Sequence, residues 1–562
     1  MDRESRLRLA LAAGLLLLTV AVYAPVRGFA FVDFDDGEYV VANPHVQRGL
    51  DGGSVAWAFS SFYAANWHPL TWLSHMLDVE LFDGWAGGHH LTNLALHAAN
   101  VILVFLLLES VAFGPWASVA VAALFAVHPL RVESVAWIAE RKDLLSALLW
   151  LLTIAAYGAW TRRGGAWRYA GVVALFALAL MAKPMAVTLP AVLVLADVWP
   201  LARLAAWRDL RPRLVEKLPL FALSLASAVV TWEAQSAFGA TMRADVLPGG
   251  ERLANAALSI VLYLRDAVWP VGLAVFYPHP ASAGGRVSRP AALAAALALL
   301  AISAAALALG RRRPWVAAGW CAWLVLLAPV IGLLQVGSQA RADRYTYLPL
   351  LPLFVVAVAF GREVARRGRR ARAAVALVAF AALSLLAIAC RIQLATWRDS
   401  RALYTRALAV TENNWLAWNN LGNVLFGEGD DRGALACFAN AIRIKPDHAD
   451  AWYNTGVARA RLGELPAAIA AYHEALHLDP GNADGWVNLG TAEEAAGDLA
   501  AAHASYRRAL ELRPDDRFAL QGLARGCVAF GDRSTARELL PRLRAVDAEG
   551  ARQLEAWLAA SR

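Results

Sequence analysis

The sequence predicts an all-α protein in two parts, a polytopic membrane helix bundle followed by a soluble α-solenoid. The chain has 562 residues, of which 59% are hydrophobic and 17% are charged. About 20 consecutive apolar residues span a bilayer, and many such runs occur in residues 1–392. Residues 393–562 instead repeat a pattern of aromatic, glycine and proline positions. We therefore place the membrane part at 1–392 and the solenoid at 393–562.

Eleven segments are predicted to cross the membrane. They are residues 7–26, 91–108, 116–127, 144–160, 169–182, 187–199, 218–233, 291–309, 315–334, 345–360 and 373–390. The first run could pass for a signal peptide, but its apolar part is long and further spans follow, so we expect an uncleaved helix. Residues 54–82 are rich in aromatic residues without a full apolar run, which favours helices lying in the membrane interface.

Residues 252–277 are not counted among these crossings. Arg265 and Asp266 lie near the middle of the segment, and each charge costs roughly 2.5–3.5 kcal/mol at a lipid-exposed helix centre. A crossing here would also move the arginine blocks at 311–313 and 362–372 out of the cytoplasm. We expect a re-entrant, in-plane or broken segment. Eleven crossings then give an integral protein of the inner or plasma membrane, with a cytoplasmic N-terminus and an extracytoplasmic tail.

The net charge and the cysteines exclude some classes of protein. A net charge of +8 would indicate nucleic acid as a partner of a soluble protein, but here the arginines cluster between apolar runs. They are typical of cytoplasmic anchors, so no nucleic acid is expected. The four cysteines lie far apart without a CxxC spacing, which predicts neither a disulfide framework nor a zinc site.

The tail repeats itself with a period of 34 residues. Tryptophan recurs at that interval, and so do proline, an aromatic residue and glycine: Trp418, Trp452, Trp486; Pro446, Pro480, Pro514; Tyr404, Phe438, Tyr472, Tyr506; Gly429, Gly463, Gly497, Gly531. Trp418-Asn-Asn-Leu421-Gly422 fits the tetratricopeptide pattern. We expect about three full repeats between a half repeat at 404–411 and a degenerate capping region that ends at Arg562. The concave face of such an array usually binds an extended peptide or a helix.

An acidic loop at residues 31–39 follows the first apolar run. It carries four carboxylates beside a membrane surface: Asp33, Asp35, Asp36 and Glu38. Carboxylates this close repel one another, so at least one should have a raised pKa or a cationic partner. A solvated acidic loop is the alternative interpretation.

Under the eleven-crossing topology, several charged loops reach the same side as the acidic loop. They are residues 33–38, His68, residues 128–143, Lys183 and residues 339–345. Carboxylates opposite cations suit a reaction in which a base deprotonates an acceptor and a phosphate leaves as an anion. Arg141, Lys183 and Arg344 could neutralise that phosphate. Taken singly, each could instead be an interface anchor or an ion pair that fixes the bundle.

The histidines divide into two groups. His68 and His128 are each followed by proline just outside a span, which favours contact with a substrate. His97 lies within a span, where a hydrogen bond in the bundle is expected. Pairs seven residues apart, such as His68 with His75, share a helical face but do not form a specific metal spacing. No glycine-rich phosphate loop, nucleophile elbow or kinase signature is present in the sequence.

These motifs, taken in order, resemble a known family. The order is Phe34-Asp35-Asp36, Asn43, Pro69-Leu70-Thr71, His90-Leu-Thr-Asn93 with His97, Phe125-Ala-Val-His128-Pro129 with Glu133, Arg141-Lys-Asp143, and Asp343-Arg344-Tyr345-Thr-Tyr347-Leu-Pro349. It is similar to that of the transmembrane and tetratricopeptide-repeat (TMTC-like) O-mannosyltransferases, whose layout the repeat tail also matches. The chain departs from that family in its short repeat array, in Lys183-Pro184 and in an additional Asp33.

The resemblance implies a C-type (GT-C) glycosyltransferase fold for residues 1–392. The donor would be a polyprenyl-phosphate sugar such as mannose, and the acceptors would be Ser or Thr hydroxyls of proteins held by the repeats. Asp35 would take the acceptor proton, and Asp36 would orient the acceptor or share that proton. The substrate-binding residues would be Arg344, Arg141, Lys183, His128, Glu133, His68 and Asp143. A single displacement inverts the anomeric carbon, and no metal or other cofactor is required.

Two other functions are compatible with the sequence. A lipid-linked glycan ligase or polymerase would use a glycan as acceptor instead of a protein. A non-enzymatic membrane-anchored repeat scaffold would need only one span, and it gives no reason for the charged loops. A peptide-binding array favours a protein acceptor.

Overall fold

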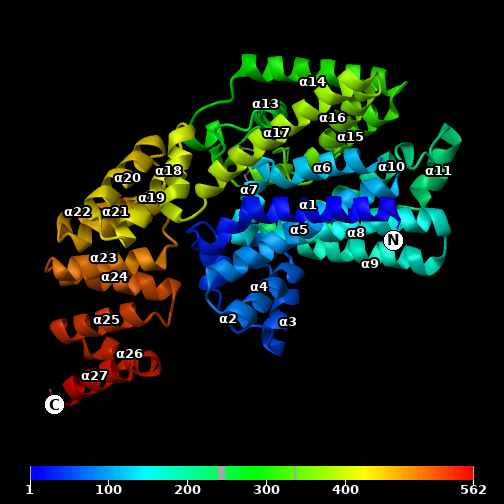
Figure 1. Ribbon diagram of the computed structural model, residues 1–562. Coiled ribbons are helices and arrows are strands. Elements are labelled where there is room, and N and C mark those ends of the chain that lie inside the picture. The colour runs from blue at the N-terminus through cyan, green and yellow to red at the C-terminus, as the bar shows by residue number, and fades with distance from the viewer. Residues whose placement is uncertain (1, 238–246, 334–336, 561–562) are drawn as a thin grey trace. The chain divides into compact units, whose positions relative to one another are not determined.

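The computed structural model describes residues 2–237, 247–333 and 337–560, and most of them are helical (Figure 1). The all-α prediction is confirmed. The chain divides into two compact units, Met1–Glu412 and Asn413–Arg562. Among the described residues, β1 (Tyr277–Pro278) and β2 (Gln339–Arg341) pair as a short antiparallel sheet.

The helices of the first unit follow one another along the chain with short connections. They are α1 (Arg3–Tyr23), α2 (Pro44–Gln47), α3 (Gly52–Ser60), α4 (Pro69–Phe82), α5 (Ala86–Ser110), α6 (Pro115–Val127), α7 (Val132–Ala136), α8 (Arg141–Arg163), α9 (Ala166–Ala182), α10 (Leu189–Val198), α11 (Trp207–Val215), α12 (Leu218–Ala237), α13 (Gly249–Val268), α14 (Arg289–Gly310), α15 (Pro314–Leu327), α16 (Leu350–Ala365), α17 (Arg369–Ala395) and α18 (Ser400–Val410). Short helical turns join them: η1 (Ala24–Gly28), η2 (Gly37–Val41), η3 (Tyr63–Ala65), η4 (Pro129–Arg131), η5 (Ile138–Glu140), η6 (Pro184–Thr188), η7 (Pro280–Ala283) and η8 (Asp343–Thr346).

Each of the eleven predicted spans contains a described helix. Within the described ranges, six segments are long and apolar enough to cross a membrane: Arg3–Gly28, Ala86–Ser110, Ile138–Arg163, Leu218–Ala237, Arg289–Gly310 and Arg369–Ala395. Pro115–Val127 with Pro129–Ala136 would be a seventh, bent by 60°. Ala166–Ala182, Pro184–Val198 and Pro314–Leu327 are apolar but shorter. The count of eleven crossings therefore stays a prediction, and Leu334, its ninth boundary, lies outside the described residues.

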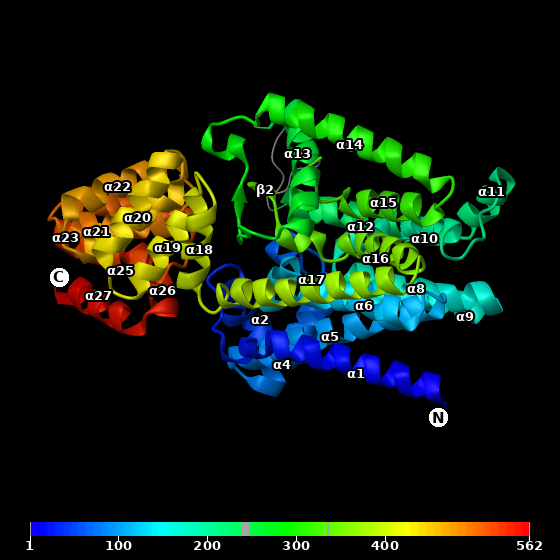
Figure 2. The same ribbon diagram turned by 45° about the horizontal axis from the view of Figure 1, so that its top comes forward.

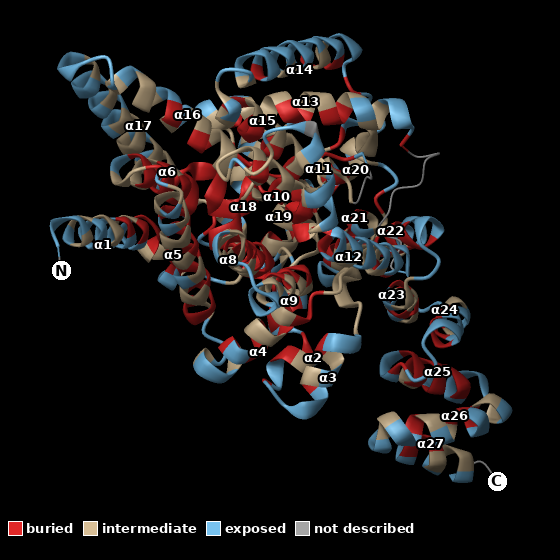
Figure 3. Ribbon diagram, turned by 90° about the vertical axis from the view of Figure 1, so that its right-hand side faces the viewer, coloured by how far each residue is buried: buried red, intermediate tan, exposed pale blue. Residues whose placement is uncertain are grey.

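The apolar helices α14 and α17 expose most of their surface. Only 17% of the apolar window of α14 and 6% of that of α17 is buried within the protein, and Figure 3 shows both helices largely in the exposed colour. Leucines and phenylalanines left uncovered in this way would be unfavourable in water but not in lipid. These helices indicate an integral membrane protein.

The segment excluded from the crossings is a helix followed by a short strand. Helix α13 ends at Val268 and is absent from the segments long and apolar enough to span, counted over the described residues. Its Asp266 is fully buried and forms ion pairs with Arg341 (2.6 Å) and Arg265 (2.7 Å). The charge that argued against a lipid-exposed crossing is thus paired inside the protein, and whether the segment enters the membrane stays a prediction.

The arginine-rich turns of the first unit gather at one end of the bundle. Three contacts join them: Arg8 with Glu109 (2.9 Å), Arg313 with Glu363 (2.9 Å), and Arg362 over the ring of Phe113 (4.8 Å). They connect the start of α1, the α5–α6 turn, the α14–α15 turn and the α16–α17 turn, which lie on the right in Figure 2. Clustering of positive charge at one end is what the positive-inside rule requires of one membrane face.

The second unit is a stack of helix pairs. It contains α19 (Trp415–Gly427), α20 (Asp431–Ile444), α21 (Ala449–Arg461), α22 (Leu465–Leu478), α23 (Ala483–Ala495), α24 (Leu499–Leu512), α25 (Arg517–Phe530), α26 (Arg533–Val546) and α27 (Ala548–Ala560). The capping region is described up to Ala560, so Arg562, its predicted end, lies outside the described residues.

Two local contacts explain the period of 34 residues. The indoles of Trp452 and Trp486 donate hydrogen bonds to the carbonyls of Pro446 and Pro480, at 2.9 and 3.0 Å. Tryptophan and proline therefore recur together because each pair fixes the turn into a repeat. Glycine recurs because the partner helix passes close by: a Cβ at the repeat glycines would lie 2.4–2.9 Å from the rings that pack on them, in the pairs Gly422–Phe438, Gly456–Tyr472 and Gly490–Tyr506.

The boundary between the units differs from the predicted one. It falls after Glu412, whereas the sequence predicted it after residue 392. The predicted half repeat at 404–411 lies within the first unit, where α18 packs on the acidic loop. An aromatic residue at the repeat spacing was the only signal for that half repeat, and it does not distinguish a repeat helix from another amphipathic helix.

The topology can be tested by cysteine labelling. With Cys437 and Cys527 replaced, single cysteines are introduced at Asp484 in the repeats or at Arg367 in the α16–α17 turn. If the arginine-rich turns face the cytoplasm, a membrane-impermeant maleimide should label Asp484→Cys and not Arg367→Cys in intact spheroplasts. Permeabilised cells provide the control, since both sites should then react. Labelling of Arg367→Cys alone in intact cells would place the repeats in the cytoplasm.

Candidate active site

The first unit encloses a cavity of about 690 Å³ to which distant segments contribute. Its walls come from the acidic loop, η3, the start of α8, the α9–η6 junction, α12 and the segment that carries β2 and η8. Six charged residues line it: Asp35, Glu38, Glu140, Lys142, Lys183 and Arg344. The predicted convergence of charged loops is therefore present in the structure, within a single recess.

Asp35 faces this cavity in a strained backbone conformation. Its φ is 71°, a left-handed value that aspartate tolerates better than most residues. The residue is exposed, but to the cavity that it lines. The surrounding protein raises the pKa of Asp35 by desolvation, against the opposing effect of Lys142 and Arg344. Strained residues held in place by their surroundings are frequent at active sites.

Asp36 points away from the cavity and into the protein. It is fully buried, and its carboxylate accepts hydrogen bonds from the backbone N–H groups of Val32 and Ala139, both at 2.9 Å. Burial raises the pKa of Asp36 to about 7, although the two hydrogen bonds oppose the shift. This carboxylate joins the acidic loop to the segment before α8. The adjacent aspartates are thus placed for different roles.

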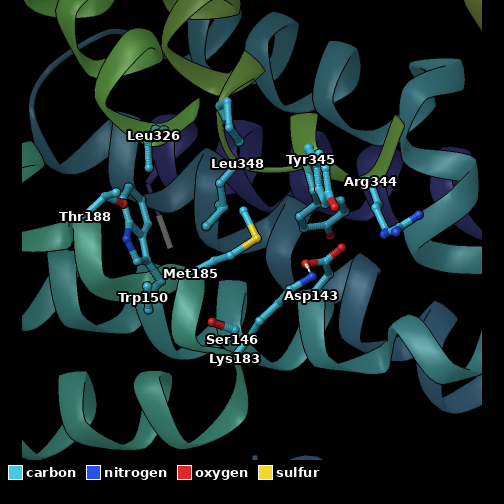
Figure 4. Close-up of a pocket in the computed structure, with 13 residues that line it drawn as sticks. Asp143, Ser146, Trp150, Lys183, Met185, Thr188, Leu326, Arg344, Tyr345 and Leu348 are labelled. Atoms are coloured by element: carbon cyan, nitrogen blue, oxygen red, sulfur yellow. Dashed lines mark hydrogen bonds and ion pairs between the residues drawn. The ribbon is translucent and has the colours of Figure 1, made fainter. Parts of the chain in front are cut away.

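The three cations of the cavity are already paired with carboxylates. Arg344 contacts Glu133 through Nη1 at 2.5 Å and through its backbone N–H at 2.7 Å. Lys183 contacts Asp143 at 2.6 Å, as Figure 4 shows in the smaller pocket of about 30 Å³ that both residues line. Glu140 lies within 3.4 Å of all three cations, including Lys142. An incoming phosphate would therefore share these cations with carboxylates.

Two residues predicted to bind substrate lie elsewhere in the structure. Arg141 is fully buried, forms an ion pair with Asp78 and donates to Asn93 Oδ1 at 2.8 Å. His128 is also fully buried: its Nδ1 accepts from the Leu130 N–H, and its Nε2 lies 3.0 Å from the Ala267 carbonyl. Neither side chain lines the cavity. Both hold helices of the bundle together.

His68 lines the cavity and keeps its ring nitrogens available. It stacks on Tyr39 with ring centroids 5.6 Å apart. Over the residues that the structure describes, neither ring nitrogen has a hydrogen-bond partner. Burial lowers the pKa of His68 well below its ordinary value, so the ring is neutral and can both donate and accept a hydrogen bond. It is suited to contact a sugar hydroxyl.

Several residues that line the cavity were not singled out from the sequence. Lys142 stands over the ring of Tyr39 at 4.4 Å, and Trp137 and Glu140 lie beside it. Consecutive residues of a helix point about 100° apart, so the motif at 141–143 could not place all its charges in one site. The wall from α12, which includes Trp232 and Gln235, lies in a predicted span and gave no chemical signal.

A membrane helix bundle with an acidic-loop cavity, followed by helical repeats, is the class of protein that these features define. A family model described as Tetratricopeptide repeat matches residues 424–483 and 462–517. The repeat prediction is confirmed, and the second unit contains tetratricopeptide repeats.

Curated relatives carry the name that the motifs predicted. Protein O-mannosyl-transferase Tmtc2 of Drosophila melanogaster is 32% identical over 200 residues, which is 32% of this chain and 21% of that protein. Protein O-mannosyl-transferase TMTC4 of Homo sapiens is 32% identical over 169 residues, 26% of this chain and 22% of that protein. The chain is therefore similar to the TMTC O-mannosyltransferases, as predicted, although the matches span only about a fifth of the length of these relatives.

Among solved structures, the crystal structure of MamA protein aligns at 22% identity over 27% of this chain and 84% of that chain, with a TM-score of 0.25. This value is too low to extend the fold assignment beyond the repeats already matched.

The opposite placement of the two aspartates can be tested by thermal unfolding. Asp36→Ala leaves two buried N–H groups without an acceptor, each at a cost of about 1–3 kcal/mol. We expect a clearly lower melting temperature of the purified chain in detergent. Asp33→Ala is the matched control, because the described contacts of Asp33 with Ser400 and Tyr404 use its backbone. Equal melting of the two variants would show that the Asp36 carboxylate does not hold the loop.

Proposed function

We propose that this protein is a membrane glycosyltransferase that moves a sugar, such as mannose, from a polyprenyl phosphate to Ser or Thr hydroxyls of proteins. The observation that carries the proposal is the single cavity in which Asp35 faces Lys142, Lys183 and Arg344. The names of the curated relatives support a glycosyltransferase role. A scaffold protein would give no reason for a charged cavity among apolar helices.

Asp35 is the proposed base. It accepts the proton of the acceptor hydroxyl while the hydroxyl oxygen forms a bond to the anomeric carbon. The bond from that carbon to the phosphate oxygen breaks, and its electron pair leaves with the polyprenyl phosphate. A single displacement inverts the anomeric configuration. Base catalysis of this kind contributes about 10²–10⁴-fold.

Arg344 and Lys183 would neutralise the leaving phosphate. The contacts of Arg344 with Glu133 and Glu140 involve Nη1 and Nε, so Nη2 is the nitrogen through which a phosphate oxygen would be bound. The carboxylates of Glu133 and Asp143 would orient the two cations. His68 would contact the sugar. We assign Asp36, Arg141 and His128 to the support of the cavity, because their side chains point away from it.

The repeats would hold the acceptor protein. Arrays of this kind bind extended segments on their concave face. The cavity and the repeats would lie on the extracytoplasmic side. This orientation is supported by the arginine-rich end of the bundle, because α8 runs from the cavity at Lys142 to Arg163 over 23 residues, about 34 Å. That length places the two features at opposite membrane faces.

The base assignment predicts the effect of two substitutions. Asp35→Asn keeps the side-chain shape but removes the proton-accepting charge, so transfer should fall by about 10²–10⁴-fold while donor affinity is retained. Arg344→Ala should weaken both donor binding and turnover, because the leaving phosphate loses its counter-charge. Product formation and donor affinity are measured side by side with purified protein in lipid and a polyprenyl-phosphate sugar.

The pH dependence gives a second test of the same base. Only ionised Asp35 can accept a proton, so the rate should rise with pH through the pKa of this group. Since desolvation raises that pKa, the acidic limb should lie above the range of an ordinary aspartate. Near-normal transfer by Asp35→Asn, with the same acidic limb, would remove Asp35 from the mechanism.

Deletion of the repeats separates recruitment from catalysis. A chain that ends at Glu412 keeps the cavity and α18 but lacks the second unit. Transfer to protein acceptors should fall much more than donor hydrolysis or transfer to a small hydroxyl acceptor. Equal loss of both activities would mean that the repeats support the fold. Undiminished transfer to a lipid-linked glycan, with no transfer to protein by the full chain, would favour a glycan ligase or polymerase.

A further inference from the structure

Helix α18, which the repeat spacing had assigned to the tail, is hydrogen-bonded to the acidic loop. The backbone N–H of Asp33 donates to Ser400 Oγ at 2.7 Å. The hydroxyl of Tyr404 donates to the backbone carbonyl of Asp33, and the tyrosine is 1% exposed. Both polar groups of one peptide residue, two positions before Asp35, are therefore held by a single helix turn.

The residues between α17 and α18 hold the loop at two further points. The backbone carbonyl of Arg398 accepts from the Ala30 N–H at 3.0 Å. Trp397, which is 1% exposed, packs against Trp137 with ring centroids 6.0 Å apart. The indole of Trp137 in turn donates to the carbonyl of Phe34 at 2.8 Å. The loop is thus fixed at residues 30, 33 and 34, immediately before the strained residue.

Such support has a physical purpose at this position. A non-glycine residue with positive φ costs of order 1–3 kcal/mol and persists only where its surroundings determine it. The conformation directs the Asp35 carboxylate into the cavity while Asp36 points into the protein. A loop released at Asp33 could relax to a negative φ, and such a rotation would change the direction of the Asp35 side chain.

We propose that Ser400 and Tyr404 are positioning residues for Asp35, so that α18 is part of the transfer machinery and not a repeat. The inference rests on the proposed function for its catalytic part. Its structural part, that α18 holds the acidic loop, stands independently. The repeats begin directly after α18, so the chain that would carry the acceptor is covalently continuous with the helix that orients the base.

The test uses Tyr404→Phe and Ser400→Ala in the full chain. Both remove one hydroxyl and leave the fold of the helix. Turnover should fall by about 10- to 100-fold, the effect of a misplaced catalytic group, while donor affinity is unchanged. The acidic limb of the rate should also move to lower pH, because a relaxed loop hydrates Asp35. The charged groups around it are Glu38, Glu140, Lys142 and Arg344, and none of them is altered.

Tyr169→Phe is the matched control. The Tyr169 hydroxyl also donates to a backbone carbonyl, that of Glu216, among the arginine-rich turns. This variant should keep the turnover and the acidic limb of the unaltered chain. A loss of turnover without movement of the limb in the α18 variants would indicate a general loss of folded enzyme and would overturn the positioning role.

Hydrogen–deuterium exchange supplies a readout that does not depend on activity. Amides of residues 29–36 should exchange faster in Ser400→Ala and Tyr404→Phe than in the unaltered chain, and unchanged in Tyr169→Phe. Unaltered exchange in both α18 variants would overturn the inference, whether or not the chain transfers sugar. Faster exchange with unchanged turnover would confine α18 to a structural role and leave the proposed function intact. Absence of transfer by the unaltered chain would instead count against the proposed function alone.

Discussion

The carboxylate of Glu140 is the charge on which the cavity depends. Three cations reach it from separate parts of the chain: Lys142 at 3.2 Å, Lys183 at 3.0 Å and Arg344 at 3.4 Å. Without an anion between them these groups would repel one another strongly in a poorly hydrated recess. Glu140 therefore allows cations from α8, from the α9–η6 junction and from η8 to lie together before any phosphate is bound. The carboxylates also set a threshold for ligands, because an anion must compete with them.

Much of the fold could be predicted from the sequence, because its signals are long and repeated. Apolar runs located helices at all eleven predicted spans, and four residue types at one period located the repeats. The half repeat failed for the opposite reason: it rested on Tyr404 alone. The tyrosine occupies its repeat spacing, yet its hydroxyl is bonded to the acidic loop. A single residue at the correct interval carries little information about its neighbours in space.

The candidate site was predictable as a set of loops but not residue by residue. Asp35 and Asp36 are adjacent and chemically equivalent, and only a positive φ separates the one in the cavity from the one in the protein. Arg141 and Lys142 are likewise adjacent, and the register of α8 turns the arginine toward Asp78 and the lysine toward Tyr39. Sequence identifies which chemistry is available; side-chain direction depends on backbone angles that a charge pattern does not determine.

The small buried fraction of α17 has a consequence for the membrane in which the protein works. Between Arg372 and Arg391 this helix offers an apolar stretch of 18 residues, about 27 Å long, against a hydrocarbon core of about 30 Å. Charged residues bound the stretch at both ends, so little tilt is available to match a thicker bilayer. Because Trp397 and α18 follow directly, bilayer thickness sets the depth at which the acidic loop meets the lipid headgroups. Lipid chain length is thus a physical variable of the catalytic site itself.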